Sequence, residues 1–200
     1  MKLDRSRTAL VVVDVQEAFR PAVLDFARVA RNVATLVRGA RILGLPTLVT
    51  EQYPKGLGHT VAEVSEHLDV AESLGAERSA RPEDFRCGRS AQMFEKVAFS
   101  AVDADGFPGA LHAAERDQVL LCGIEAHVCV NQTAQDLIAD GMEVHVAQDA
   151  VTSRTAENRA LGLHRMERSG AVATSVETAL FELLRAAGTP EFRQVQALVK

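Results

Sequence analysis

Two charged residues stand in apolar surroundings, one directly after an expected strand and one within another. Asp14 directly follows the apolar run 8–13, and Lys96 lies within the largely apolar segment 94–99. A charged group in such a setting is costly to desolvate unless a partner holds it. The sequence therefore predicts that the carboxylate and the ammonium solve this problem by pairing with each other.

A third reactive residue, Cys129, follows the apolar run 118–124 through a short turn and belongs to the pattern HVCVNQTAQDLI. This pattern predicts a helix with the thiol in its first turn, where free N–H groups and the helix dipole favour the thiolate. The same N–H groups can stabilise an oxyanion, as a cysteine hydrolase requires. The alternative is that Cys129 is a small buried apolar residue and Asp14 an amide-capping carboxylate, because free cysteines are often buried.

Composition and charge limit the class of protein. The chain has 200 residues, 47% apolar and 24% charged, and no low-complexity run, which predicts one folded domain over residues 1–200. The formal net charge of -5 disfavours nucleic acid as a partner, because phosphate binding needs clustered positive charge. The apolar run near the amino terminus is too short for a signal sequence or a membrane span, so we expect a cytoplasmic protein without a membrane partner.

The cysteines indicate free thiols. Cys87, Cys122 and Cys129 are odd in number and lack zinc-finger spacing, which disfavours a disulfide framework. We expect Cys122 in the core, because it lies in the middle of an apolar run, and Cys87 on the surface, because its segment is polar.

The elements that would position these side chains alternate between strand and helix patterns. Parallel strands need crossover connections, so the alternation predicts a three-layer α/β sandwich around one parallel sheet. Ligands bind such sheets at the carboxyl ends of the strands. The expected strands are 8–13, 45–50, 94–99, 118–124, 143–147 and 171–175, and the expected helices are 26–43, 61–68, 127–140, 157–169 and 176–187.

One connection breaks this regularity. Residues 71–92 are polar and contain Arg78, Arg81, Arg86 and Arg89, which is unusual for a connection inside a compact domain. The segment is either a lid over the site or a surface excursion without a chemical role. We favour the surface excursion.

Five segments, taken in order, carry a family signature. They are DVQEAF (14–19), TEQYPKGLGHTVAE (50–63), EKVAFSA (95–101), CGIEAHVCVNQTAQDL (122–137) and QDAVTSR (148–154). Together they resemble the isochorismatase-like cysteine hydrolase superfamily, and TEQYPKGLG with the closing FRQVQALVK is most similar to its isochorismatase-domain-containing group of uncharacterised hydrolases. The resemblance implies a six-stranded parallel sheet in the order 3-2-1-4-5-6 and a homo-oligomer.

The resemblance also implies a catalytic triad at Asp14, Lys96 and Cys129, the same residues that the pattern singles out. It implies a non-proline cis peptide between Ile124 and Glu125, with the N–H groups of Glu125 and Cys129 forming an oxyanion hole. In the implied mechanism Asp14 takes the thiol proton, Cys129 attacks a carbonyl-type carbon, and water completes the cycle. Lys96 would favour the thiolate and hold Asp14 in place.

Residues on two loops are candidates to line a substrate pocket. Gln16 and Phe19 follow the first strand, and Gln52 and Tyr53 follow the second. His127, two residues before the cysteine, is a further candidate for contact with substrate. The alternative is that these side chains only pack the rim or, for His127, only begin a helix.

A metal site is not expected. The nicotinamidase branch of the superfamily binds a metal through a D-x-H pattern after the second strand, whereas this segment reads EQYPKGLGH. No aspartate begins it and only His59 is near, so we expect neither metal nor any other cofactor. His67, further along, fits a solvated helix face.

Retention of the cysteine bears on the reaction. Isochorismatases proper hydrolyse a vinyl ether and do not need the cysteine, so its presence favours hydrolysis of a C–N bond in a small amide or carbamate through a thioester-like intermediate. Two alternatives stay open: a vinyl-ether hydrolase of the isochorismatase type, and a non-catalytic oligomeric binding or scaffold protein, since fold does not fix function.

Overall fold

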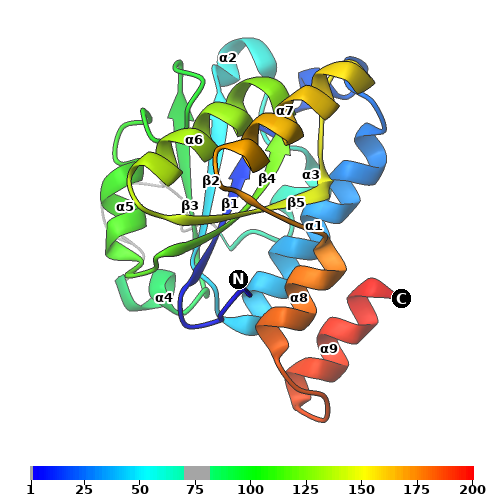
Figure 1. Cartoon of the computed structure of the whole chain (residues 1–200). Helices are drawn as coiled ribbons and strands as arrows, with labels where there is room; N and C mark the ends of the chain where they lie inside the picture. The colour runs from blue at the N-terminus through cyan, green and yellow to red at the C-terminus, as the bar shows by residue number, and fades with distance from the viewer. Residues whose placement is uncertain (1, 70–81) are drawn as a thin grey trace.

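The chain folds around one parallel sheet in a computed structural model that describes residues 2–69 and 82–200 (Figure 1). The six strands of this sheet run in the order β3-β2-β1-β4-β5-β6, which confirms the predicted topology. Every strand pair in it is parallel. The strands are β1 (Thr8–Val13), β2 (Thr47–Gln52), β3 (Ala91–Lys96), β4 (Gln118–Ile124), β5 (Glu143–Thr152) and β6 (Val172–Thr174).

Helices cover both faces of the sheet and complete the predicted three layers (Figure 1). One face carries α1 (Phe26–Leu43), α3 (Ala62–Ser65), α8 (Val176–Leu184) and α9 (Pro190–Val199), and the other carries α5 (Phe107–Ala113), α6 (Asn131–Ala139) and α7 (Ala156–Arg168). The connections contain η1 (Glu17–Phe19), α2 (Pro54–Leu57), α4 (Pro82–Arg86) and the π-helical turn η2 (Ala126–Val130).

The central strand shows why the sheet forms where it does. Successive side chains of a strand point to opposite faces, and β1 is buried throughout. Leu10 and Val12 join the core beneath α1, whereas Val11 and Val13 join the core beneath α5 and α6. An unbroken aliphatic run is therefore the pattern that a strand between two helical layers requires.

The third strand begins and ends three residues earlier than predicted, at Ala91 and Lys96 instead of 94 and 99. Beyond Lys96 the chain turns, because the carbonyl oxygens of Ala98 and Phe99 both accept hydrogen bonds from the Lys96 ammonium. This turn leaves the Val97 side chain on the surface, with Val97 79% exposed. The residues after Lys96 thus bind its ammonium group through their backbone carbonyl oxygens rather than extend the sheet.

The described part of the polar segment 71–92 lies away from the carboxyl ends of the strands. Phe85 of α4 is buried in the core, and Arg86 donates a hydrogen bond from Nε to the carbonyl oxygen of Ala113, shortly before β4 begins. Residues 82–92 therefore pack at the opposite edge and form a helix and the start of β3. Arg78 and Arg81 lie outside the described residues.

Candidate active site

The strand order brings four strand ends together at the carboxyl edge of the sheet. Lys96 ends β3 beside Gln52 of β2, and Val13 of β1 lies between Thr50 and Gly123 in the register. Asp14 follows β1 in the left-handed region, at φ 52°. An aspartate tolerates this conformation better than most residues, and it is common at turns.

Asp14 and Lys96 form a fully buried ion pair, as the sequence predicts. The Lys96 Nζ lies 2.7 Å from the Asp14 Oδ2, and neither side chain has accessible surface. The ammonium also donates to Oε1 of Gln52 at 2.8 Å and to the carbonyl oxygen of Phe99 at 3.0 Å. Asp14 accepts a further hydrogen bond at Oδ1 from the Thr50 hydroxyl, at 2.7 Å.

This arrangement predicts a large loss of stability when Lys96 is replaced by methionine. Removing one partner of a buried pair leaves an uncompensated charge, which costs about 3 to 5 kcal/mol of unfolding free energy. Urea unfolding measures this cost. The double variant with Asp14→Asn is expected to recover part of the loss, and a single variant as stable as the wild type would contradict the pairing.

The π-helical turn η2 places Cys129 beside this pair. The carbonyl oxygen of Glu125 accepts the N–H groups of Val128 and Val130, at 3.1 and 3.2 Å, which fixes the turn. Helix α7 approaches it so closely that a Cβ on Gly162 would lie 2.5 Å from the Ala126 backbone. Cys129 is 5% exposed.

The charges of Asp14 and Lys96 both act on the Cys129 thiol. Burial, the largest influence, and then the Asp14 charge raise the pKa of the thiol, the Lys96 charge opposes them, and the net result is a pKa of about 12. Lys96 favours the thiolate, as expected, but the net shift of the thiol pKa is upward rather than downward. A helix start and one lysine do not outweigh desolvation together with a neighbouring carboxylate.

The raised thiol pKa gives a direct prediction for alkylation by iodoacetamide, which reacts with the thiolate. In a Cys87→Ser variant, the alkylation rate of Cys129 should rise about tenfold per pH unit from about pH 7 to pH 11, whereas an ordinary thiol levels off above about 8.5. Peptide mass spectrometry resolves Cys129 from the buried Cys122. A plateau for Cys129 near pH 8 would contradict the geometry.

Glu125 joins the site to the segment after β5. The peptide bond between Ile124 and Glu125 is cis, at the position that the resemblance implies. The Glu125 carboxylate is buried, and its Oε1 accepts both the backbone N–H and the Nε–H of Arg154, each at 3.0 Å. Sequence reasoning missed this ion pair, although Arg154 closes the segment QDAVTSR.

Most of the chain matches a known protein family. The family model described as the isochorismatase domain matches residues 8–178. The chain belongs to the isochorismatase family. This confirms the resemblance that the motifs carry.

Relatives of this isochorismatase-family chain extend over its full length. Isochorismatase domain-containing protein 2 of Danio rerio is 38% identical over 99% of the chain and 89% of the relative. The secreted isochorismatase effector Isc1 of Phytophthora sojae is 39% identical over 96% of the chain and 84% of the relative. A solved structure of the MAR1 ribonuclease from Caenorhabditis elegans is 37% identical, covers 100% of the chain and 92% of its own, and has a TM-score of 0.85.

Two of the predicted substrate contacts, Gln16 and Gln52, make hydrogen bonds within the scaffold of this isochorismatase-family chain. Gln16 is buried, and its Nε2 donates to the carbonyl oxygens of Gln52 and Gly58, at 3.0 and 2.6 Å. Its Oε1 accepts the N–H of Gln52 at 2.7 Å. The Gln52 side chain in turn bonds Lys96 and the carbonyl oxygen of Val97. Both glutamines therefore position the loops around the ion pair.

The other predicted contacts keep free surface. Tyr53 is 55% exposed and, with Val97, lines a hollow of about 460 Å³ beside β3. Phe19 is half-buried and packs against the core beneath α1. His127 is half-buried, with its Nδ1 3.1 Å from the Ser153 hydroxyl. These three residues remain candidates for contact with substrate.

His59 pairs with a buried carboxylate rather than joining a cluster of metal ligands. Its Nδ1 lies 2.9 Å from Oε2 of Glu51, and this hydrogen bond, followed by the Glu51 charge, raises the pKa of His59. Among residues 2–69 and 82–200, no group of three or more His, Cys, Asp or Glu side chains could hold a metal ion. No helix in the same residues is long and apolar enough to cross a membrane.

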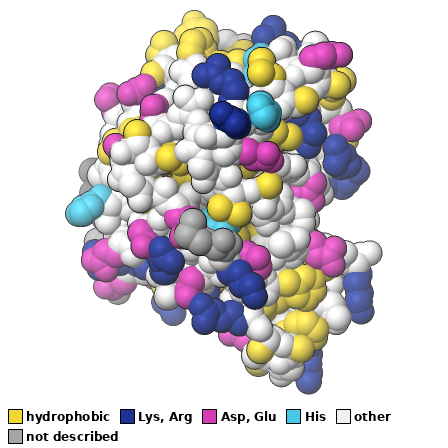
Figure 2. Space-filling model, viewed as in Figure 1, with side chains coloured by type: hydrophobic (Ala, Val, Ile, Leu, Met, Phe, Trp, Pro, Cys, Tyr) yellow, Lys and Arg dark blue, Asp and Glu magenta, His cyan; other side chains and the backbone are white. Residues whose placement is uncertain are grey.

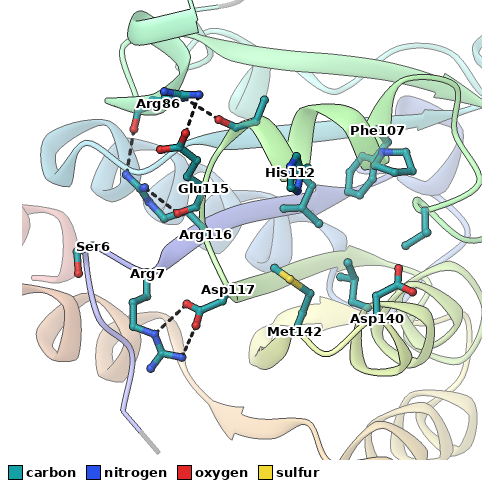
Figure 3. Close-up of a pocket in the computed structure, with 15 residues that line it drawn as sticks. Ser6, Arg7, Arg86, Phe107, His112, Glu115, Arg116, Asp117, Asp140 and Met142 are labelled. Atoms are coloured by element: carbon teal, nitrogen blue, oxygen red, sulfur yellow. Dashed lines mark hydrogen bonds and ion pairs between the residues drawn. The ribbon is translucent and has the colours of Figure 1, made fainter.

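A second hollow, of about 700 Å³, lies between α5 and the end of α6 (Figure 3), and Asp14, Lys96 and Cys129 are not among its lining residues. Arg7 and Asp117, which precede β1 and β4, form an ion pair at its wall, as do Arg86 and Glu115. These residues place the hollow at the amino ends of the strands. It is therefore separate from the site built around Cys129.

Proposed function

We propose that this protein is a cysteine hydrolase that cleaves a C–N bond of amide or carbamate type in a small molecule. In this proposal Cys129 is the nucleophile, Asp14 the general acid and base, and Lys96 the residue that holds Asp14. One observation carries the proposal: a fully buried Asp14–Lys96 pair acts on a cysteine thiol at the carboxyl edge of a parallel sheet.

The proposed reaction begins from the neutral thiol. As the Cys129 sulfur attacks the carbonyl carbon, its proton passes to Asp14, and the N–H groups of Glu125 and Cys129 stabilise the oxyanion. Asp14 then returns the proton to the leaving nitrogen as the C–N bond breaks, which leaves a thioester or thiocarbamate on Cys129. Water attacks this carbonyl, Asp14 takes its proton, and the sulfur leaves and is reprotonated. Lys96 stays charged throughout.

A small-molecule substrate fits the surface better than a nucleic acid does. The net charge is -5, and on the face shown in Figure 2 the Lys and Arg side chains are interspersed with Asp and Glu. A protein that follows phosphates needs a continuous basic surface. The name of the worm relative nevertheless makes RNA a necessary control in any activity test.

The test is an activity screen over small amides, ureas and carbamates that measures the release of ammonia or amine. Isochorismate and single-stranded RNA are the comparison substrates. Hydrolysis of a C–N compound that depends on Cys129 supports the proposal. Turnover of isochorismate that does not depend on Cys129 would favour the vinyl-ether hydrolase, and cleavage of RNA alone would reject a small-molecule substrate. A wild type inert towards every compound would favour the scaffold alternative.

The remaining predictions concern organisation. We propose that residues 1–200 form one domain and that copies of it assemble into a homo-oligomer, which light scattering after gel filtration measures. Cytoplasmic location stays a prediction, and the Phytophthora sojae relative is named as a secreted protein.

A further inference from the structure

Thr50 forms two hydrogen bonds with Asp14. Its hydroxyl donates to Oδ1 of Asp14 at 2.7 Å, and its carbonyl oxygen accepts the Asp14 N–H at 3.1 Å. Thr50 and Asp14 both have no accessible surface, so water cannot replace either bond. The other carboxylate oxygen, Oδ2, carries the ammonium of Lys96. Each oxygen of the carboxylate thus has its own donor, and the two donors come from different strands.

We propose that Thr50 is a positioning residue that holds the Asp14 carboxylate in place for proton exchange with Cys129 and so tunes the reactivity of this thiol. The inference rests on the proposed function, because it concerns the proton that Asp14 exchanges with the thiol. A hydroxyl that donates to a carboxylate favours its charged form. In a dry site, the charged form of Asp14 keeps the proton on sulfur, because a thiolate beside a carboxylate is repelled by it.

This coupling makes Thr50 act on Cys129 through Asp14. When the hydroxyl is absent, Oδ1 of Asp14 loses a donor that favours its negative charge, and the carboxyl group repels the thiolate less. The proton of Cys129 then moves to Asp14 in a larger fraction of molecules, and the sulfur becomes more reactive. A residue with only a packing role would not link the reactivity of Cys129 to the charge of Asp14.

The test measures alkylation of Cys129 by iodoacetamide at neutral pH in a Cys87→Ser background, so that no substrate needs to be known. Thr50→Val should accelerate alkylation about tenfold, the change that one pKa unit of the thiol produces. Thr50→Ser keeps the hydroxyl and should react at the wild-type rate. Thr47→Val is the matched control, because Thr47 is buried on the same strand and its hydroxyl donates to the carbonyl oxygen of Leu45 instead of to Asp14.

A double variant distinguishes an effect of Thr50 that passes through Asp14 from a general loosening of the structure around Cys129. If Thr50 acts through Asp14, Thr50→Val should change nothing once Asp14→Asn is present, because no charge is left to tune. Equal acceleration in both backgrounds, or none in either, would overturn the proposal. Thr50→Ala replaces Thr50→Val if circular dichroism shows that the valine variant does not fold. The hydrolysis screen is separate: absence of turnover rejects the proposed function, whereas wild-type turnover without this coupling rejects only the role of Thr50.

Discussion

A Cys129→Ala variant should lose the C–N hydrolase activity of the wild type by about a thousandfold or more, because removing a nucleophile removes the covalent route altogether. The thiol is 5% exposed and packs in the core beneath α5 and α6, so the variant should still fold. Initial rates of ammonia or amine release, compared with a thermal unfolding curve, measure the two effects separately.

Cys122→Ala is the matched control for this loss. Cys122 is also buried, but it lies within β4 in the core beneath α1, on the other face of the sheet. Burial raises its pKa far above the ordinary range, and Asp14 and Lys96 are not among the groups that shift it. The same chemical change there should leave turnover intact. Undiminished turnover in Cys129→Ala would show that the reaction does not pass through this sulfur.

Replacing Asp14 by asparagine should change two measurements in opposite directions. Hydrolysis should fall by about a hundredfold or more, because no group remains to accept the thiol proton and return it to the leaving nitrogen. Alkylation of Cys129 at neutral pH should become faster, because the Asp14 charge raises the pKa of the thiol and the Lys96 charge, which lowers it, remains.

Slower hydrolysis together with faster alkylation of Cys129 distinguishes a catalytic Asp14 from an Asp14 that only supports the fold. Loss of the carboxylate also leaves the Lys96 ammonium buried without its counterion, so a lower unfolding free energy is expected. Damage to the fold alone would slow hydrolysis and expose the two buried cysteines, Cys122 and Cys129, alike to alkylation. Slower alkylation of Cys129 in a folded Asp14→Asn variant would contradict the electrostatic account.

Much of this organisation follows from local patterns in the sequence. β1 and α1 have the predicted bounds because a continuous aliphatic run and a helical stripe ended by a left-handed Gly44 leave few alternatives. The pairing of Asp14 with Lys96 was predictable because each charge needs a partner in an apolar setting. These inferences depend on neighbours along the chain or on one strong energetic requirement.

What was missed depends on residues that meet only after folding. β3 ends where the carbonyl groups of Ala98 and Phe99 turn towards the Lys96 ammonium, and an apolar sequence pattern does not predict that turn. Thr50 is an ordinary strand residue by type, and its contact with Asp14 appears only with the register of β1 and β2. The pKa of Cys129 is a balance of burial against two opposite charges, which no single motif encodes.

The most direct measurement is mass spectrometry of the protein quenched in acid during turnover of a small amide or carbamate. The expected result is a mass increase equal to the acyl group of the substrate minus the thiol hydrogen that it replaces, located on the peptide that carries Cys129 and absent from Cys129→Ala. Turnover with no adduct at this residue, or with an adduct on another side chain, would contradict it.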